Sequence, residues 1–293
     1  MPTRATTAEN RAVSEKDRTS TKRPTLVYII GAGHCGSTLL NLLLNGHDHI
    51  LGLSEFHSLG DYTRRDALDP PLDHPFWKKV RDCYEQRSGR SFADVDLNTP
   101  YQSFRDVLNG PMEPLQDWVA DHETLYSCVA EQSGARLLVD SSKTWQRLYL
   151  LWRSGRFHIK SIHLIRDGRA VTNSYARKYD DLRGAKRWVK SSLYSEYMRW
   201  RFGERWLRVY YEDLAARPEP TLRRICDYLN VAYQPGMLAY RDDRYVGIGG
   251  NRMRKHDHDR IQLDERWKHE LSWKRRWIFD LLGGWLNKYY GYY

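Results

Sequence analysis

The 293-residue sequence contains few cysteines and no long apolar run. Its four cysteines form no C-x-x-C pair and no metal-ligand spacing with histidine, so we expect no metal site and four free thiols in a reducing, cytoplasmic location. No apolar stretch approaches the roughly 18 residues that a membrane-spanning helix needs. Residues 1–24 are polar and lack the apolar core of a signal peptide, so we expect a disordered leader.

Basic residues outnumber acidic ones, and the formal net charge is +10. A hydrophobic content of 41% with 13% aromatic residues indicates a globular protein rather than a disordered one. The positive charge suits a nucleic acid, an anionic membrane surface or a polyanionic small molecule as partner, and a solvated basic surface would explain it as well. Charge alone therefore does not select a function.

Short apolar strands alternate with helical patterns, which predicts an α/β fold with a parallel sheet covered on both faces. The expected strands cover residues 25–30, 50–53, 136–139, 159–165 and 206–211. The expected helices cover residues 74–86, 113–132, 144–153, 170–178, 185–202 and 221–229. We expect residues 25–293 to form a single domain, with a mainly helical insertion at 56–134 and an aromatic helix at 262–293.

The loop after the first strand fits two phosphate-binding patterns. Residues 31–36 read G-x-G-x-x-G with Glu55 about 20 positions later, as in dinucleotide-binding proteins. The same residues also read as a P-loop in which Ser37 holds the position of the usual lysine. Both patterns place backbone N–H groups and a helix N-terminus around a phosphate. The missing lysine and the lack of a Walker-B aspartate run argue against ATP or GTP hydrolysis.

Polar clusters follow the other predicted strands, at residues 54–57, 140–143, 166–169 and 211–213. In a parallel sheet these strand ends meet at one edge, where ligands bind. Arg166 can fork onto a phosphate with two N–H groups, and Ser174 lies about two helical turns further on. Alternatively, Arg166 has a local role at the start of a helix whose N-cap is Asp167.

Five segments in this order resemble the motifs of sulfotransferases that use 3′-phosphoadenosine-5′-phosphosulfate (PAPS), especially the bacterial, carbohydrate and tyrosyl-protein types. They are 34–40 (HCGSTLL), 139–143 (VDSSK), 164–171 (LIRDGRAV) with Ser174, 210–214 (YYEDL) and 250–254 (GNRMR). The resemblance runs from the first strand to the C-terminus. It implies a three-layer, P-loop-like α/β fold and metal-free, in-line transfer of a sulfuryl group to a hydroxyl or amine.

The resemblance also implies which residues hold PAPS and its product, 3′-phosphoadenosine-5′-phosphate (PAP). Loop amides would cradle the 5′-phosphosulfate, while Arg166 and Ser174 would grip the 3′-phosphate. Tyr211 would lie near the adenine, although a buried strand tyrosine is an equally good interpretation. The implied cofactor-binding residues are Gly33, His34, Cys35, Gly36, Ser37, Thr38, Arg166, Ser174, Tyr211, Asn251, Arg252 and Arg254.

Sulfuryl transfer needs a cation at the leaving oxygen and a base at the acceptor. Many relatives place arginine or lysine where this chain has His34, so His34 acts either as an imidazolium or as a neutral donor. Lys143 is the better candidate for the cation, unless it is only a surface lysine at a helix start. For the base, Glu55 matches the glutamate after the second strand of the relatives, and His57 is the alternative.

Two other functions compete with sulfuryl transfer. A flavin- or nicotinamide-dependent oxidoreductase would use residues 31–36 and Glu55, but would leave Arg166 and Ser174 without a role. A non-catalytic nucleic-acid-binding protein would explain the charge but not the strand-end clusters. A thiol nucleophile at Cys35 lacks an orienting Asn or Asp, so we do not expect one. We therefore favour a sulfotransferase, with no nucleic acid as partner.

The sequence leaves alternatives for the acceptor and for the role of the C-terminal segment. A small molecule, a sugar or a peptide would each suit an acceptor pocket formed by residues 56–134, and the oligomeric state leaves no signal. Apolar residues at 263, 267, 271, 278, 282 and 285 recur at helical spacing. They favour a helix packed across the sheet. The alternatives are an interfacial helix that makes peripheral membrane contact and an aromatic platform for a sugar or nucleic acid.

Overall fold

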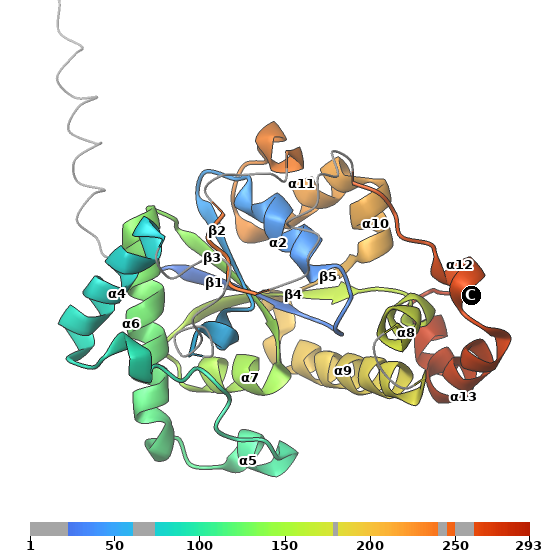
Figure 1. Ribbon diagram of the computed structural model, residues 1–293, viewed down its shortest axis with the longest axis horizontal. Coiled ribbons are helices and arrows are strands. Elements are labelled where there is room, and N and C mark those ends of the chain that lie inside the picture. The colour runs from blue at the N-terminus through green and yellow to red at the C-terminus, as the bar shows by residue number, and fades with distance from the viewer. Residues whose placement is uncertain (1–22, 61–73, 178–180, 240–244, 250–260) are drawn as a thin grey trace, which may run out of the picture.

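Five parallel strands form one central sheet in the order β2-β3-β1-β4-β5, with helices on both faces (Figure 1). The computed structural model describes residues 23–60, 74–177, 181–239, 245–249 and 261–293, so nearly all of the expected leader lies outside it. The strands are β1 (Thr25–Ile30), β2 (Ile50–Ser54), β3 (Leu137–Lys143), β4 (His158–Ile165) and β5 (Trp206–Tyr210). The α/β class predicted from the sequence is confirmed.

The described helices surround this sheet. They are α2 (Ser37–Asn45), α4 (Pro75–Ser88), α5 (Phe104–Asn109), α6 (Gln116–Ser133), α7 (Trp145–Arg153), α8 (Gly168–Ala176), α9 (Asp181–Phe202), α10 (Tyr211–Ala216), α11 (Pro218–Leu229), α12 (Trp267–Glu270) and α13 (Trp273–Tyr289). Short 3₁₀ turns cover Phe56–Ser58, Phe92–Asp94, Glu113–Leu115, Gly203–Arg205 and Pro235–Leu238. The described residues between β2 and β3 are mainly helical.

The central strand β1 sends alternate side chains into two separate apolar cores, because successive residues of a strand point to opposite faces. Leu26, Tyr28 and Ile30 join the core formed with α4, α6 and α7. Val27 and Ile29 join the core formed with α2, α10 and α11. In Figure 1, α2, α10 and α11 lie above the sheet, α7 lies below it, and α4 and α6 lie at its left. Burial on both faces explains why β1 is a continuous apolar run.

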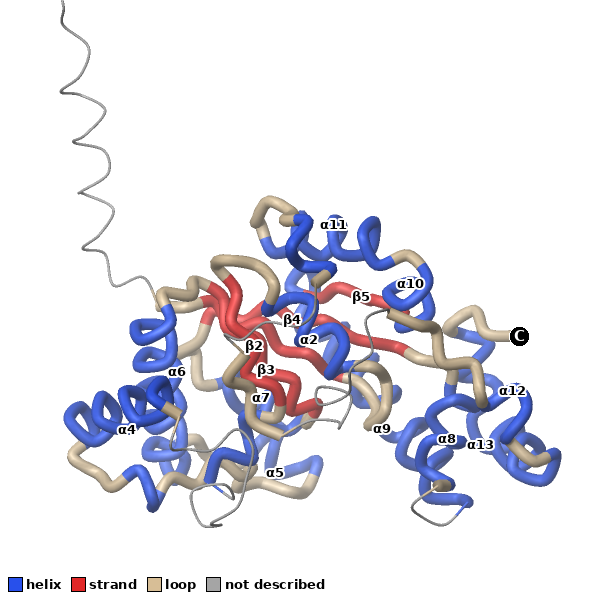
Figure 2. The backbone as a smooth tube through the Cα atoms, turned by 45° about the horizontal axis from the view of Figure 1, so that its top comes forward, coloured by secondary structure: helices blue, strands red, loops and turns tan. Residues whose placement is uncertain are grey.

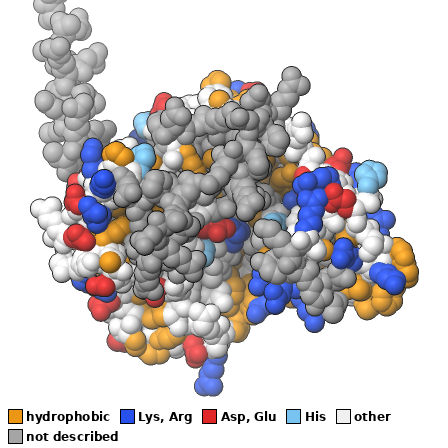
Figure 3. Space-filling view, viewed as in Figure 1, with side chains coloured by type: hydrophobic (Ala, Val, Ile, Leu, Met, Phe, Trp, Pro, Cys, Tyr) orange, Lys and Arg blue, Asp and Glu red, His pale blue; other side chains and the backbone are white. Residues whose placement is uncertain are grey.

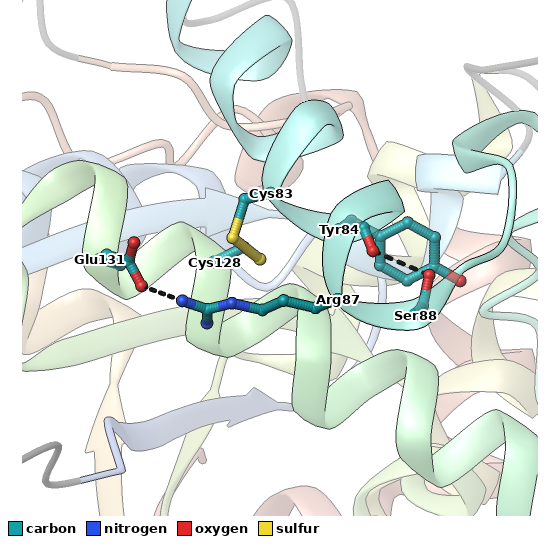
Figure 4. The surroundings of a disulfide bond; sticks show 6 residues. All are labelled: Cys83, Tyr84, Arg87, Ser88, Cys128 and Glu131. Carbon is teal, nitrogen blue, oxygen red and sulfur yellow. Dashed lines mark hydrogen bonds and ion pairs between the residues drawn. A yellow bond between two sulfur atoms is a disulfide. The ribbon is translucent and has the colours of Figure 1, made fainter.

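A disulfide bond joins Cys83 of α4 to Cys128 of α6 (Figure 4). The expectation of four free thiols is therefore wrong, and only Cys35 and Cys226 remain free. The two helices pack side by side and bring the Cα atoms to 5.9 Å, within the usual range for a disulfide. Spacing in the sequence carried no sign of this, because the two cysteines are 45 residues apart. Disulfides are rare in the cytosol, so this bond gives no support to a cytoplasmic location.

The aromatic C-terminal segment forms two helices, α12 and α13, instead of one. Leu271 is extended and ends α12, and the side chain of Ser272 caps α13 by accepting a hydrogen bond from the Arg275 amide. Helix α13 packs on α8 and α9 rather than across the sheet, at the far end of the molecule from α4 and α6 (Figure 2). Trp285, which helical spacing placed with the packed residues, is exposed.

Candidate active site

The loop between β1 and α2 is closely packed at its glycines. A Cβ atom on Gly33 would lie 2.2 Å from the hydroxyl oxygen of Tyr175, and one on Gly36 would lie 2.4 Å from the ring of Tyr211. Gly36 is also the N-cap of α2, with a left-handed φ of 95°, and supplies no side-chain cap. The positive end of the α2 dipole therefore faces the loop without a side-chain cap, an arrangement that suits an anion.

Arg166 lies beside this loop, at the end of β4. Its two terminal nitrogens donate to the carbonyl oxygens of His34 and Asp264, each at 3.0 Å. The guanidinium group also lies over the ring of Tyr211, 4.3 Å from the centroid. The side chain is only 7% exposed, and its buried Nε has no hydrogen-bond partner. The fold thus brings the loop, Arg166 and Tyr211 together around one fixed positive charge.

Asp264 supplies a negative charge at this position, which the sequence analysis did not anticipate. Its carboxylate lies 3.2 Å from Arg166 and accepts two hydrogen bonds from Arg266, at 2.8 and 2.9 Å. The bonds from Arg266 are the main reason that the pKa of Asp264 lies well below its usual range; burial opposes them, and Arg166 adds to them. Arg166, which the sequence predicts to bind a phosphate, is thus paired with a carboxylate of its own chain.

Glu55 and Lys143 form an ion pair across the ends of β2 and β3. Lys143 Nζ donates to Glu55 Oε1 at 2.6 Å and to the carbonyl oxygen of Ser141 at 3.0 Å. Burial by itself raises the pKa of Glu55, but the charge and hydrogen bond of Lys143 outweigh it, so the pKa lies below its usual value. Glu55 keeps about a third of its side chain exposed, which leaves it open to a ligand.

Left-handed backbone conformations collect at this edge of the sheet. The described chain has four non-glycine residues with positive φ, and three of them lie here. They are His34 (62°) in the loop after β1, Ser54 (58°) at the end of β2 and Lys143 (63°) at the end of β3. Such conformations are costly for residues with a Cβ atom and cluster at functional sites. The surrounding fold therefore holds this edge of the sheet in a shape that the local sequence would not adopt.

A fully buried polar network supports the end of β3. The carboxylate of Asp140 pairs with Arg147 at 3.0 Å and accepts hydrogen bonds from Tyr126 at 2.7 Å and from the Ser142 amide at 2.9 Å. Ser142 in turn accepts a hydrogen bond from the backbone amide of His57. Burial raises the pKa of Asp140, but Arg147 and these hydrogen bonds hold it below its usual value. The network ties the loop that carries Glu55 to the strand that carries Lys143.

Helix α13 braces the turn that follows Arg166. The buried amide side chain of Asn287 accepts a hydrogen bond from the Gly168 amide at 2.9 Å and donates to the carboxylate of Asp167 at 3.2 Å. Asp167 also caps α8 by accepting from the Arg169 amide, as the alternative interpretation of this segment expected. The position of Arg166 therefore depends on a residue more than 100 positions further along the chain.

The sheet order is incompatible with the dinucleotide-binding alternative. In that fold the strand that follows the glycine-rich helix lies next to the first strand, where its acidic residue reaches the ribose. Here β3 lies between β1 and β2, and Glu55 at the end of β2 is paired with Lys143. The glycines of the loop are explained by close packing against Tyr175 and Tyr211, without a dinucleotide.

Comparison with known proteins identifies the family. Residues 24–235 match the sequence pattern of the sulfotransferase family. The chain belongs to the sulfotransferase family. Two solved structures share its fold: the sulfotransferase domain of the olefin synthase of Synechococcus PCC 7002 (23% identity, TM-score 0.57, covering 89% of this chain and 95% of that one) and that of the curacin biosynthetic pathway (23%, 0.54, 89% and 98%). A comparison with curated protein sequences finds no match.

Some residues predicted for the site of this sulfotransferase make local contacts instead. The hydroxyl of Ser174 donates to the Ala170 carbonyl of its own helix at 3.0 Å. The His34 ring packs edge-on against Tyr175, with centroids 4.7 Å apart. Burial raises the pKa of Cys35, so its thiol is a poor nucleophile, in line with the sequence analysis. Predicted residues Asn251, Arg252 and Arg254 lie outside the described part of the chain.

Three residues that shape the site of this sulfotransferase were not predicted from the sequence: Asp264, Asn287 and Arg147. Asp264 stands in a polar segment that follows no predicted strand, and Asn287 lies within the aromatic helix, so neither gave a signal. Arg147 was detectable in principle, because a charged residue interrupts the buried face of an otherwise amphipathic helix.

The described residues include no group of three or more His, Cys, Asp or Glu side chains that could hold a metal ion. None of the described helices is both long enough and apolar enough to cross a membrane.

Proposed function

We propose that this sulfotransferase transfers the sulfuryl group of PAPS to a hydroxyl or amine of a small-molecule, carbohydrate or peptide acceptor. One observation carries the proposal: the N-terminus of α2, to which Gly36 gives no side-chain cap, and the buried guanidinium of Arg166 flank the same loop. Two separate anion-binding elements on one loop suit a ligand with phosphate groups at two positions, as PAPS has. A dinucleotide joined by a single pyrophosphate would need only one of them.

The residues around Arg166 fit a phosphate. The guanidinium already balances the carboxylate of Asp264, and its Nε is a buried donor without a partner. A phosphate in place of that carboxylate would restore the charge balance and offer an acceptor to Nε. Tyr211 is buried, and its ring lies against the guanidinium, so it supports Arg166 from one side. Ser37 and Thr38, at the first turn of α2, add hydroxyl groups near the second anion site.

PAPS, when bound, supplies an activated sulfuryl group whose transfer leaves negative charge on a phosphate oxygen. Lys143 is the cation best placed to meet that charge, because its flexible side chain lies at the strand ends beside Glu55 and is 16% exposed. Turning toward the leaving oxygen would take Nζ away from Glu55. The pKa of Glu55 would then rise, because its stabilising partner has left and burial remains. Glu55 would thereby become a better base for the acceptor proton in the same movement.

His57 is the alternative base, and its geometry is less favourable. Burial lowers its pKa, with a further contribution from Arg147, so the ring is neutral near pH 7 and able to accept a proton. However, its Nδ1 is buried without a partner, and its backbone amide is held by Ser142. Glu55 reaches solvent and touches the proposed cation, so we assign the role of base to Glu55.

The disulfide bears on where this enzyme works. A bond between Cys83 and Cys128 forms and persists in an oxidising compartment. It therefore weighs against the cytoplasmic location that the sequence suggested. The bond lies between α4 and α6, within the helical segment that we propose forms much of the acceptor pocket.

Calorimetric titration with PAP, without metal, tests the donor assignment. We expect binding in the micromolar range or tighter, weakened by about 10- to 100-fold in Arg166→Ala through the loss of charge-assisted hydrogen bonds. Arg166→Lys should keep part of the affinity, because it retains the charge but loses the fork. Arg223→Ala, at an exposed arginine of α11 paired with Glu219, is the matched control and should bind as the wild type does. Binding of NAD or FAD instead of PAP would overturn the proposal.

A further inference from the structure

Helix α13 has one face packed into the protein. Its buried residues are Phe279, Gly283, Leu286 and Asn287. Phe279 lies edge-on to Trp188 of α9, and Asn287 braces the turn before α8. A surface helix of this kind normally carries polar residues on its opposite face.

The opposite face of α13 is instead aromatic and apolar. A row at four-residue spacing runs along it, and every member is more than half exposed: Trp273, Trp277, Leu281, Trp285 and Tyr289. With 3.6 residues per turn, this row covers a sector of about 160°. We call these five residues the outer row. Figure 3 shows hydrophobic side chains with basic ones beside them at the lower right, where Figure 1 places α13. Large aromatic residues exposed together in this way mark an interaction surface.

The charges on this face have one sign. Lys274 and Lys288 fall within the same sector of the helix as the outer row, and both are exposed. The one acidic residue of α13, Asp280, falls outside this sector, toward the edge of the packed face. Neither lysine pairs with a carboxylate among the described residues of the chain. The face thus combines tryptophan, tyrosine and leucine with uncompensated positive charge.

We propose that the outer row docks on the surface of an anionic lipid bilayer. Tryptophan and tyrosine favour the boundary between head groups and acyl chains, where their rings are buried and their polar atoms stay wet. Lysines in the same sector lie at the height of the head groups and attract anionic lipids. The helix would lie in the plane of the membrane, with its packed face still holding α8 and α9.

A second copy of the chain is a poorer occupant of this face. A two-fold interface places the same patch on both subunits, so every charge must find its partner within the patch. Lys274 and Lys288 would meet lysines and aromatic rings there but no carboxylate. An anionic bilayer supplies the missing negative charge.

Sedimentation with lipid vesicles tests the proposal on the full chain. We expect the wild type to pellet with vesicles of phosphatidylcholine mixed with phosphatidylglycerol, and to stay in the supernatant with phosphatidylcholine alone. Trp277→Ser/Trp285→Ser should reduce binding to the anionic vesicles by about tenfold or more, because two interfacial anchors are lost. These residues are exposed, so the variant should keep the wild-type thermal unfolding midpoint.

A pair of charge reversals separates specific docking from general basicity. Lys274→Glu/Lys288→Glu should also reduce binding by about tenfold or more. The matched control is Lys78→Glu/Lys79→Glu, which changes the net charge equally on two exposed lysines of α4, at the other end of the molecule (Figure 1). Equal losses in both variants, or no binding of the wild type to anionic vesicles, would overturn the proposal. So would a wild-type dimer in light scattering that Trp277→Ser/Trp285→Ser converts to monomer, because the face would then be an interface between copies.

Discussion

Replacing Asp264 by asparagine should strengthen PAP binding. The Asp264 carboxylate lies 3.2 Å from Arg166, on the side where we place a phosphate. A bound phosphate must displace this carboxylate or share the guanidinium with it, and either event costs free energy. Asparagine has the same shape and can still interact with Arg266, so the change removes charge and little else.

The distance sets the size of the effect. Two unit charges 3.2 Å apart interact by about 1 kcal/mol in water and about 5 kcal/mol at the effective dielectric constant of a protein surface. The lower end applies, because about a quarter of the Asp264 side chain is exposed and a displaced carboxylate keeps its bonds to Arg266. About 1.4 kcal/mol corresponds to a tenfold change in affinity. We therefore expect the Kd of Asp264→Asn for PAP to fall about tenfold.

Calorimetric titration of Asp264→Asn and of a neighbouring control variant with PAP tests this prediction. Glu265→Gln removes the same charge one residue away, where the carboxylate pairs with Lys268 and is half exposed, so its affinity should stay near that of the wild type. Equal gains in both variants would mean that net charge is responsible, rather than the contact with Arg166. Weaker binding by Asp264→Asn would refute the argument, because the carboxylate would then be supporting Arg166 rather than competing for it.

Three further predictions concern the base, the buried network and the disulfide. Glu55→Gln should leave the Kd for PAP nearly unchanged and lower kcat by about 100-fold, measured as PAP release; full activity would exclude it as the base. Asp140→Asn should lower the free energy of unfolding in urea by about 3–5 kcal/mol, because Arg147 stays charged and buried without its partner, and adding Arg147→Met should recover part of the loss. Because folding lowers the pKa of Asp140, the wild-type advantage should be complete above about pH 4 and should fade as the pH drops further. Cys83→Ser/Cys128→Ser should lower the free energy of unfolding by about 2–4 kcal/mol, because the bond closes a 45-residue loop. Equal stability of the oxidised and the reduced wild type would contradict this prediction.

Local sequence patterns predicted the parts of the fold that local physics determines. The apolar run of β1 is buried on both faces, so its composition alone identifies it. The position of the candidate site was also predictable, because parallel strands direct their carboxyl ends to one edge of the sheet. Glu55 and Lys143 met there as a pair although they are 88 positions apart.

Long-range contacts without a composition signal could not be predicted. The disulfide depends on the packing of α4 on α6, which the positions of Cys83 and Cys128 in the sequence do not reveal. Arg166 and Asp264 make contact although they are 98 positions apart. Asp264 lies in residues 261–265, which form neither a helix nor a strand. The break between α12 and α13 arises at Leu271, an ordinary helix former that tertiary packing holds extended.

The brace between α13 and the Arg166 turn has a consequence for how the protein is made. Asn287 follows its partner Asp167 by 120 residues, so a ribosome adds that stretch in about 6 to 24 seconds at ordinary rates of synthesis. At the start of that interval β1 to β4 and the glycine loop are already made, and β5 follows, while the turn that carries Arg166 still lacks its support. A nascent chain stalled before α13 would thus carry the sheet of a sulfotransferase and no finished place for the nucleotide. Competence to bind the donor would arrive late and abruptly, with the last helix.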